Sequence, residues 1–127
     1  MVTFCGTPRA EFNLAQAFAF LNESRKLQLI RLLQRAGELP VYYPGDEEVY
    51  MKAAETAEGE LVCALFNLGT DPIEALSLVV EKAPRKIFAL QPDGTRAEVS
   101  FRMEGNTVVL DIPCHTLTPV ILFLSAV

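Results

Sequence analysis

One histidine and three cysteines are the residues of this sequence with the widest chemical range. His115 stands beside Cys114, whereas Cys5 and Cys63 lie far from both in the sequence. Neighbouring residues of a strand point to opposite faces, so Cys114 and His115 would form a poor metal chelate, and no third ligand stands at a suitable spacing. No Gly-x-Ser-x-Gly motif is present. The sequence therefore predicts no catalytic residue, no metal site and no cofactor.

An acidic run follows Pro44 and Gly45, where Asp46, Glu47 and Glu48 are consecutive. A carboxyl group that acts as a general acid needs an apolar pocket that raises its pKa. Consecutive acids in a loop are usually solvated, so the run predicts a surface loop. The seven glycines are dispersed, one at each expected turn, which excludes a glycine-rich phosphate loop.

Three tyrosines, Tyr42, Tyr43 and Tyr50, cluster in a short stretch of the chain. A flat ring with a polar tip can cover a sugar ring, so the cluster could form a small carbohydrate-binding platform. The alternative is that these are edge-strand tyrosines with solvated hydroxyl groups. The sequence has no tryptophan, which departs from the usual composition of sugar-binding surfaces.

Composition and charge narrow the class of protein. The chain has 127 residues, half of them apolar, which suits one globular domain. Its net charge of −5 argues against nucleic acid or an anionic membrane as the main partner, because both require a basic patch. Three widely spaced cysteines do not form a disulfide framework, which favours a reducing, cytoplasmic location. No apolar stretch reaches the roughly 18 residues of a membrane span.

Residues 13–36 have the pattern of an amphipathic helix. Apolar residues recur at helical spacing, and Gly37 follows where the helix should end. In the second half of this segment, Leu29, Ile30 and Leu33 form an apolar stripe, and the four basic residues between 25 and 35 are expected to be solvated. Such a helix is marginal alone, so the stripe is expected to dock on the rest of the chain or on a partner.

From residue 39 onward the pattern changes to the alternation of β-strands. Strands are expected at 39–43, 48–55, 60–68, 75–81, 86–90, 96–103, 107–112 and 119–124, with turn residues between them. Short strands with frequent turns predict a mainly β, antiparallel β-sandwich, immunoglobulin-like or jelly-roll-like, with an N-terminal α-helix. The core is expected to contain Leu65, Leu78, Phe101, Leu110 and Leu122. Residues 60–68 and 119–124 are apolar on both faces, so these strands should be central or have one face covered by the helix.

Residues 1–8 read as a buried strand that ends at a glycine turn, with no earlier strand to pair with. This pattern favours an N-terminal segment at 1–38, the tail of a preceding domain, followed by a sandwich at 39–127. The chain is then expected to be a fragment of a longer protein.

Several turn and strand motifs resemble a known family. They are Cys63–Gly69 (Cys-Ala-Leu-Phe-Asn-Leu-Gly), Asp71-Pro72, Leu90–Gly94 (Leu-Gln-Pro-Asp-Gly) and Thr116–Leu122 (Thr-Leu-Thr-Pro-Val-Ile-Leu). Together they resemble the C-terminal β-sandwich of multidomain bacterial glycoside hydrolases. The nearest of these are the β-galactosidase-like enzymes built from a TIM barrel, an amidotransferase-like middle domain and a small β domain. The resemblance covers residues 20–127.

The resemblance implies a non-catalytic accessory domain of a larger glycoside-hydrolase-like protein, which packs on the catalytic part or on a neighbouring subunit. The catalytic carboxylates of that family lie on the barrel, so none is carried over to this chain. The alternative is a carbohydrate-binding module that uses the three tyrosines, and a small independent enzyme is a third reading. The expected partners are the remainder of the parent polypeptide or a neighbouring subunit, with carbohydrate as a further candidate ligand.

Overall fold

The structure is a computed structural model of the chain, and it describes residues 23–37 and 39–126. The predicted strand within residues 1–8 and the first half of the predicted helix lie outside the described residues. Contacts divide the chain into two compact units, Met1–Leu39 and Pro40–Val127. In the first unit, helix α2 spans Glu23–Ala36. The Gly37 amide donates to the Leu33 carbonyl at 2.9 Å, so the helix ends at the glycine where the sequence predicts.

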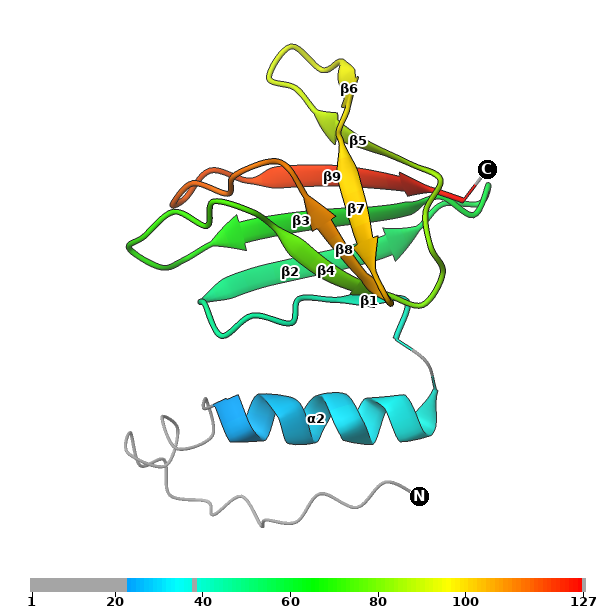
Figure 1. The fold of residues 1–127 in the computed structure, drawn as a ribbon, viewed down its shortest axis with the longest axis vertical. Helices are drawn as coiled ribbons and strands as arrows, with labels where there is room; N and C mark the ends of the chain where they lie inside the picture. Colours follow the sequence, from blue (N-terminus) through cyan, green and yellow to red (C-terminus); the bar gives the residue numbers. More distant parts are fainter. Residues whose placement is uncertain (1–22, 38, 127) are drawn as a thin grey trace. The chain divides into compact units, whose positions relative to one another are not determined.

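The second unit consists of two antiparallel sheets (Figure 1). The four-stranded sheet has the order β1-β4-β8-β7, and the five-stranded sheet has the order β2-β3-β9-β5-β6. The strands are β1 (Val41–Tyr42), β2 (Val49–Glu55), β3 (Leu61–Asn67), β4 (Ser77–Val80), β5 (Lys86–Leu90), β6 (Arg96–Glu98), β7 (Phe101–Glu104), β8 (Thr107–Leu110) and β9 (Val120–Ser125). The mainly β, sandwich-like fold with an N-terminal helix is therefore confirmed.

Glycines in the hairpin turns set where the strands end. Gly59 between β2 and β3 has a φ of 83°, and Gly94 between β5 and β6 has a φ of 86°. A side chain disfavours this left-handed conformation, so glycine is required where the chain reverses tightly. Both amides close their turns at 2.9 Å, that of Gly59 on the Thr56 carbonyl and that of Gly94 on the Gln91 carbonyl.

The single strand predicted at 96–103 is wrong. The chain forms β6 in the five-stranded sheet and then β7 in the four-stranded sheet. The amide of Val99 still donates to Ile87 of β5 at 2.9 Å, whereas the carbonyl of Ser100 accepts from Asp111, which follows β8, at 3.1 Å. The strand therefore changes sheets between Val99 and Ser100, without any break in the alternation of the sequence.

The core lies between the two sheets. Of the five predicted core residues, Leu65, Leu78, Leu110 and Leu122 are buried, as predicted. Phe101 is only partly buried and packs against the edge of this cluster, because it begins β7 directly after the crossing between sheets. β3 and β9 occupy neighbouring interior positions of the five-stranded sheet, which agrees with their apolar sequences.

Asn67 is the buried polar residue of the described core, with 1% of its surface exposed. Its side-chain amide donates to the carbonyls of Asp71 at 2.8 Å and Cys114 at 3.1 Å, and its side-chain oxygen accepts from the Gly69 amide at 2.9 Å. This one side chain therefore joins the loop after β3 to the segment before β9, and it satisfies backbone groups that burial would otherwise penalise.

Candidate functional site

The outward-facing side of the five-stranded sheet is the most distinctive surface of the sandwich, and we call it the outer face. An antiparallel sheet that packs on a core with one side normally presents polar residues on the other. Here the outward positions of β3, β9 and β5 are mainly apolar, and none of these residues belongs to the buried core. The apolar residues of the outer face are Tyr50, Ala54, Val62, Ala64, Phe66, Phe88, Leu90, Ile121 and Phe123.

The strand registers arrange the outer face in rows that run across the strands. One complete row from β2 to β6 consists of Ala54, Val62, Phe123, Phe88 and Glu98. In the neighbouring row, Lys52 pairs with Ala64, and Ala64 pairs with Ile121. Because Ala89 of β5 pairs with Leu122 of β9, the next residue of β5, Leu90, continues the row beside Ile121, and Leu90 pairs with Arg96. Beyond it, Tyr50 pairs with Phe66, and their ring centres are 6.2 Å apart with planes tilted by 52°. The row that contains Ile121 thus has a charged residue at each end, Lys52 and Arg96, and the row that contains Phe123 has one, Glu98.

Arg96 lies across the outer face rather than extending into solvent. Its guanidinium carbon is 3.6 Å from the centre of the Phe123 ring, and Nη1 donates to both carboxylate oxygens of Glu60, at 3.1 and 3.2 Å. Stacking on an aromatic ring and pairing with a carboxylate reinforce each other for a planar guanidinium. Lys86 and Glu98 form a further exposed ion pair at 3.7 Å. The side chains of Arg96 and Lys86 are therefore both paired with carboxylates of the sandwich.

The three predicted sugar-binding tyrosines do not form one exposed platform. Tyr42 belongs to β1 of the four-stranded sheet, whereas Tyr50 belongs to β2 of the five-stranded sheet. Tyr43 is 7% exposed and lies in the core, while Tyr50 is 56% exposed. Of the three rings, that of Tyr50 is the one available on the outer face, where Phe66 is its neighbour.

Tyr43 is held inside by the acidic loop that follows it. Its hydroxyl group donates to Oε2 of Glu47 at 2.8 Å. Burial first, and then this bond to Glu47, raise the pKa of Tyr43 far above its ordinary value, so the hydroxyl group stays protonated. A Cβ atom at Gly45 would lie 2.7 Å from the tyrosine oxygen, so only glycine allows this close approach. Asp46, Glu47 and Glu48 are all exposed as predicted, and Glu47 also has a structural role, its bond to Tyr43, that the sequence did not indicate.

The described thiols are shielded from solvent. Cys63 and Cys114 are both free and fully buried, and Cys5 lies outside the described residues. Burial raises the pKa of Cys63 to about 11 and also raises the pKa of Cys114. A thiol acts as a nucleophile only as thiolate, so these positions suit core packing rather than catalysis.

His115 is exposed and its neighbour Cys114 is buried, so the two point to opposite sides, as the sequence predicts. Within residues 23–37 and 39–126, no group of three His, Cys, Asp or Glu side chains is placed to hold a metal ion.

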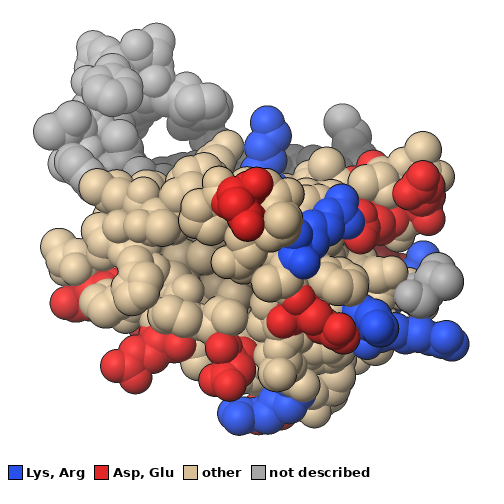
Figure 2. All heavy atoms as spheres, turned by 90° about the horizontal axis from the view of Figure 1, so that it is seen from above, with Lys and Arg blue, Asp and Glu red and all other residues tan. Residues whose placement is uncertain are grey.

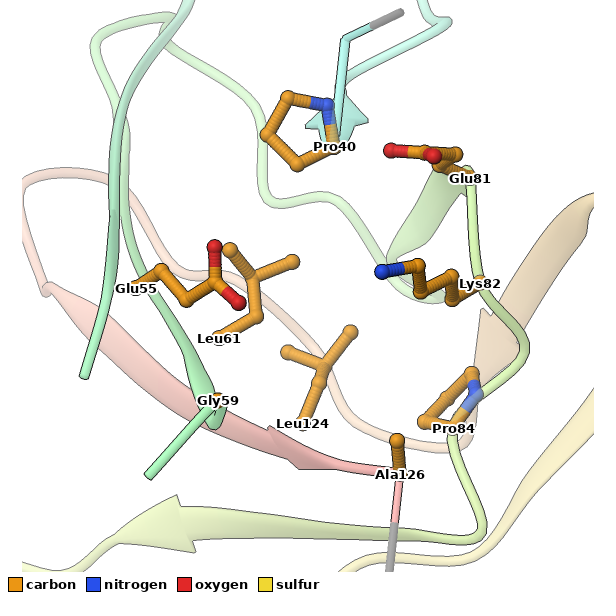
Figure 3. A pocket seen from close by; sticks show the side chains of 9 residues that line it. All are labelled: Pro40, Glu55, Gly59, Leu61, Glu81, Lys82, Pro84, Leu124 and Ala126. Atoms are coloured by element: carbon orange, nitrogen blue, oxygen red, sulfur yellow. The ribbon is translucent and has the colours of Figure 1, made fainter. Parts of the chain in front are cut away.

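A small hollow of about 80 Å³ opens at one end of the sandwich (Figure 3). The carboxylate of Glu55 and the amino group of Lys82 reach toward it from opposite walls, over the apolar side chains of Leu61 and Leu124. Pockets that bind drug-sized ligands are several times larger, and a water molecule occupies about 30 Å³ of liquid, so this hollow has room for a few waters.

On α2, the predicted docking residues differ in exposure. Leu33 is 52% exposed, and Leu29 and Ile30 are partly exposed. The role of Leu29, Ile30 and Leu33 as an interface stays a prediction.

Surface charge is mixed. In the view of Figure 2, acidic and basic side chains are interspersed, and the described residues seen there form no basic patch. In the part of the chain that the structure describes, no helix combines the length and the apolar character that a bilayer crossing requires.

Comparisons of the chain with protein families, curated protein sequences and solved structures found no match.

Proposed function

We propose that this chain is a non-catalytic accessory domain of a larger, glycoside-hydrolase-like protein, and that it packs on the catalytic part or on a neighbouring subunit. The observation that carries the packing role is the apolar outer face of the five-stranded sheet, on which Tyr50 and Leu90 are exposed and the other large apolar residues are half-buried. Soluble monomers rarely leave a large contiguous apolar patch open to water, and such patches mark surfaces that another protein covers.

The link to a glycoside hydrolase rests on the motifs Cys63–Gly69, Leu90–Gly94 and Thr116–Leu122. The first supplies Asn67, which joins two loops, and the second forms the hairpin turn closed by Gly94. The resembling motifs thus coincide with positions that organise the sandwich. They support a related architecture, and the enzyme class of the parent is part of the proposal.

The experiment that tests this proposal is the size of the natural polypeptide. An antibody raised against the sandwich should detect a protein far larger than the 14.0 kDa of this chain, and the reading frame that encodes it should specify a barrel domain upstream. The larger protein should hydrolyse nitrophenyl glycosides, whereas the isolated chain should not. A natural polypeptide of 14.0 kDa, or an upstream region without a barrel, would refute the proposal.

The alternative function is a carbohydrate-binding module, and the exposed ring of Tyr50 beside Phe66 favours it. Of the predicted residues, Tyr50 would then carry the binding, with Tyr42 on the other sheet and Tyr43 in the core. Calorimetric titration with galactosides and plant glycans should detect binding that Tyr50→Ala removes and Tyr42→Ala leaves unchanged. Absence of binding at millimolar ligand would exclude this function.

A further inference from the structure

β2 is the longest strand at the borders of the two sheets (Figure 1). It has seven residues, whereas the other border strands, β1, β6 and β7, have two, three and four. Proteins usually guard a sheet edge against further pairing by keeping it short or by placing charged residues on it. β6 and β7 are both short and charged, with Arg96 and Arg102 held in ion pairs. β2 instead is long and contains two consecutive small residues, Ala53 and Ala54.

The side of β2 that does not pair with β3, which we call the free edge, presents unsatisfied backbone groups. The Thr56 amide donates to the Glu60 carbonyl at 2.8 Å, which fixes the residues of β2 that bond to β3. Because such bonds alternate along an antiparallel pair, the amide and carbonyl groups of Met51, Ala53 and Glu55 point away from β3. In the part of the chain that the structure describes, no hydrogen bond is made by these groups. Ala53 and Glu55 are also exposed, so this half of the edge is open to water.

Lys52 is the middle residue of β2, and its side chain lies on the outer face. It is exposed, and among the described residues it has no ion-pair partner. Like charges that stand directly opposite each other on neighbouring strands are destabilising. A second copy that paired antiparallel with the whole of β2 would place its own Lys52 opposite this one. The charge therefore disfavours self-pairing and favours a partner with an acidic residue at this position.

We infer that the free edge of β2 binds an extended segment of a partner protein as a further antiparallel strand, with an acidic side chain of that segment opposite Lys52. The residue opposite Met51 is expected to be apolar, because Met51 packs against the core, and the residue opposite Glu55 is expected to be basic. In this mode of recognition, backbone hydrogen bonds supply affinity and alternate side chains supply selectivity. The inference goes beyond the proposed function, which concerns the outer face.

A synthetic peptide with the order Lys-Thr-Val-Glu-Val, blocked at both ends, is the probe. In the antiparallel direction its first residue faces Glu55, its Glu faces Lys52 and its last Val faces Met51. A backbone hydrogen bond gains little net free energy in water, so we expect a dissociation constant in the high micromolar range. Titration of the full chain should give saturable changes in the NMR signals of the Ala53 and Glu55 amides. Absence of saturation at several millimolar peptide would overturn the inference.

Substitution of Ala53 tests the role of the backbone. Ala53→Pro removes the outward amide, and proline is tolerated on an edge strand where its missing N–H would face solvent. This variant should bind the peptide about tenfold more weakly or worse. Ala53→Val is the matched control, because it keeps the amide and suits a strand, and it should bind like the natural sequence. With thermal melts showing both variants folded, equal affinity of the two would overturn the inference.

A charge exchange at Lys52 tests the register. Lys52→Glu changes an exposed side chain without an ion-pair partner in the described residues, so the sandwich should stay folded. It should weaken binding of the peptide by about fivefold, because an attraction across the strands becomes a repulsion. A second peptide with Lys in place of its Glu should bind Lys52→Glu more tightly than it binds the natural sequence. The same order of affinities for both peptides would overturn the inference.

Hydrogen exchange of the protein without peptide identifies any other occupant of the free edge. The amides of Ala53 and Glu55 should exchange rapidly in the free protein and slowly in the complex. Protection that increases with protein concentration would assign the edge to a second copy, and protection independent of concentration would assign it to the chain itself. Either result would overturn the inference. The proposed function would be unaffected, because it is decided by the size and reading frame of the natural polypeptide.

Discussion

Leu65 illustrates how single buried side chains stabilise the sandwich. It lies on β3 with no exposed surface, between the two sheets. Leu65→Ala removes apolar contacts and leaves a cavity, so the free energy of unfolding should fall by about 2–5 kcal/mol. A reversible denaturant melt measures this loss. Leu117→Ala makes the same chemical change at a side chain that is 74% exposed and should cost far less. A similar loss for both variants would contradict the burial of Leu65.

Leu117 is unusual because its φ of 58° lies in the left-handed region, which disfavours side chains. Leu117→Gly relieves this conformation but gives the unfolded chain more freedom, so stability should stay constant or rise by up to about 1 kcal/mol. Leu117→Val adds a β-branched side chain to the same backbone and should lower the free energy of unfolding by about 1 kcal/mol. In one denaturant melt the glycine variant should therefore be more stable than the valine variant, and a loss of stability with glycine would contradict this prediction.

Cys63 should make the stability of the sandwich decrease at alkaline pH. Burial raises its pKa to about 11 in the folded state, from 9.0 in the unfolded chain. The unfolded state therefore loses its proton first, and the stability present below pH 9 decreases as pH rises to 11, by about 2–3 kcal/mol. The raised pKa of Tyr43 acts in the same direction at still higher pH. Melts across this pH range should show a shallower decline for Cys63→Ala than for the natural sequence.

Single-residue environments were the least predictable feature of the candidate site. Tyr43 adjoins Tyr42 in a short extended segment, and the alternation there does not show that the loop folds back onto the ring. That burial depends on the close approach at Gly45 and on the bond to Glu47, both of which are contacts made only in the folded chain. In contrast, four predicted core leucines are buried, because alternation within a strand determines their side directly.

At the scale of elements, turn residues and alternation were sufficient to locate most strands. The range predicted for β5 is the observed one, and β2, β3 and β9 begin and end close to their predicted limits. The crossing at Val99 and Ser100 was missed, because inward and outward positions keep alternating when a strand passes from one sheet to the other. The outer face was missed for a related reason: its rows depend on pairings between strands distant in the sequence.

Arg96 should stabilise the β5–β6 hairpin against local opening. Arg96→Ala removes both its stacking on Phe123 and its bonds to Glu60, so amide exchange in β5 and β6 should accelerate, with a loss of about 1 kcal/mol. Arg96→Lys keeps the charge without the planar stacking and should recover only part of this loss. Arg102→Ala is the control, because its exposed pair with Glu104 is made within one strand. Equal exchange rates in Arg96→Ala and Arg102→Ala would contradict the role of Arg96.

At the scale of the whole molecule, the buried core of the described residues lies entirely within the unit Pro40–Val127. The fragment that spans this unit should therefore fold without residues 1–39 and unfold cooperatively. A denaturant melt followed by circular dichroism measures this, with the full chain as the reference. A broad, non-cooperative transition of the fragment would show that the first unit is needed to complete the fold.

The hollow of Figure 3 has a consequence for how this sandwich can be joined to other chains. Pro40 and Ala126 line the same hollow from opposite sides, so the backbone enters and leaves the sandwich at the same end. A domain whose backbone enters and leaves at one end can be placed within a surface loop of another protein. The same arrangement allows a linking peptide to connect the two points across the hollow while new termini are opened at the Gly94 turn. The order of strands in space would then be retained although their order along the chain is changed.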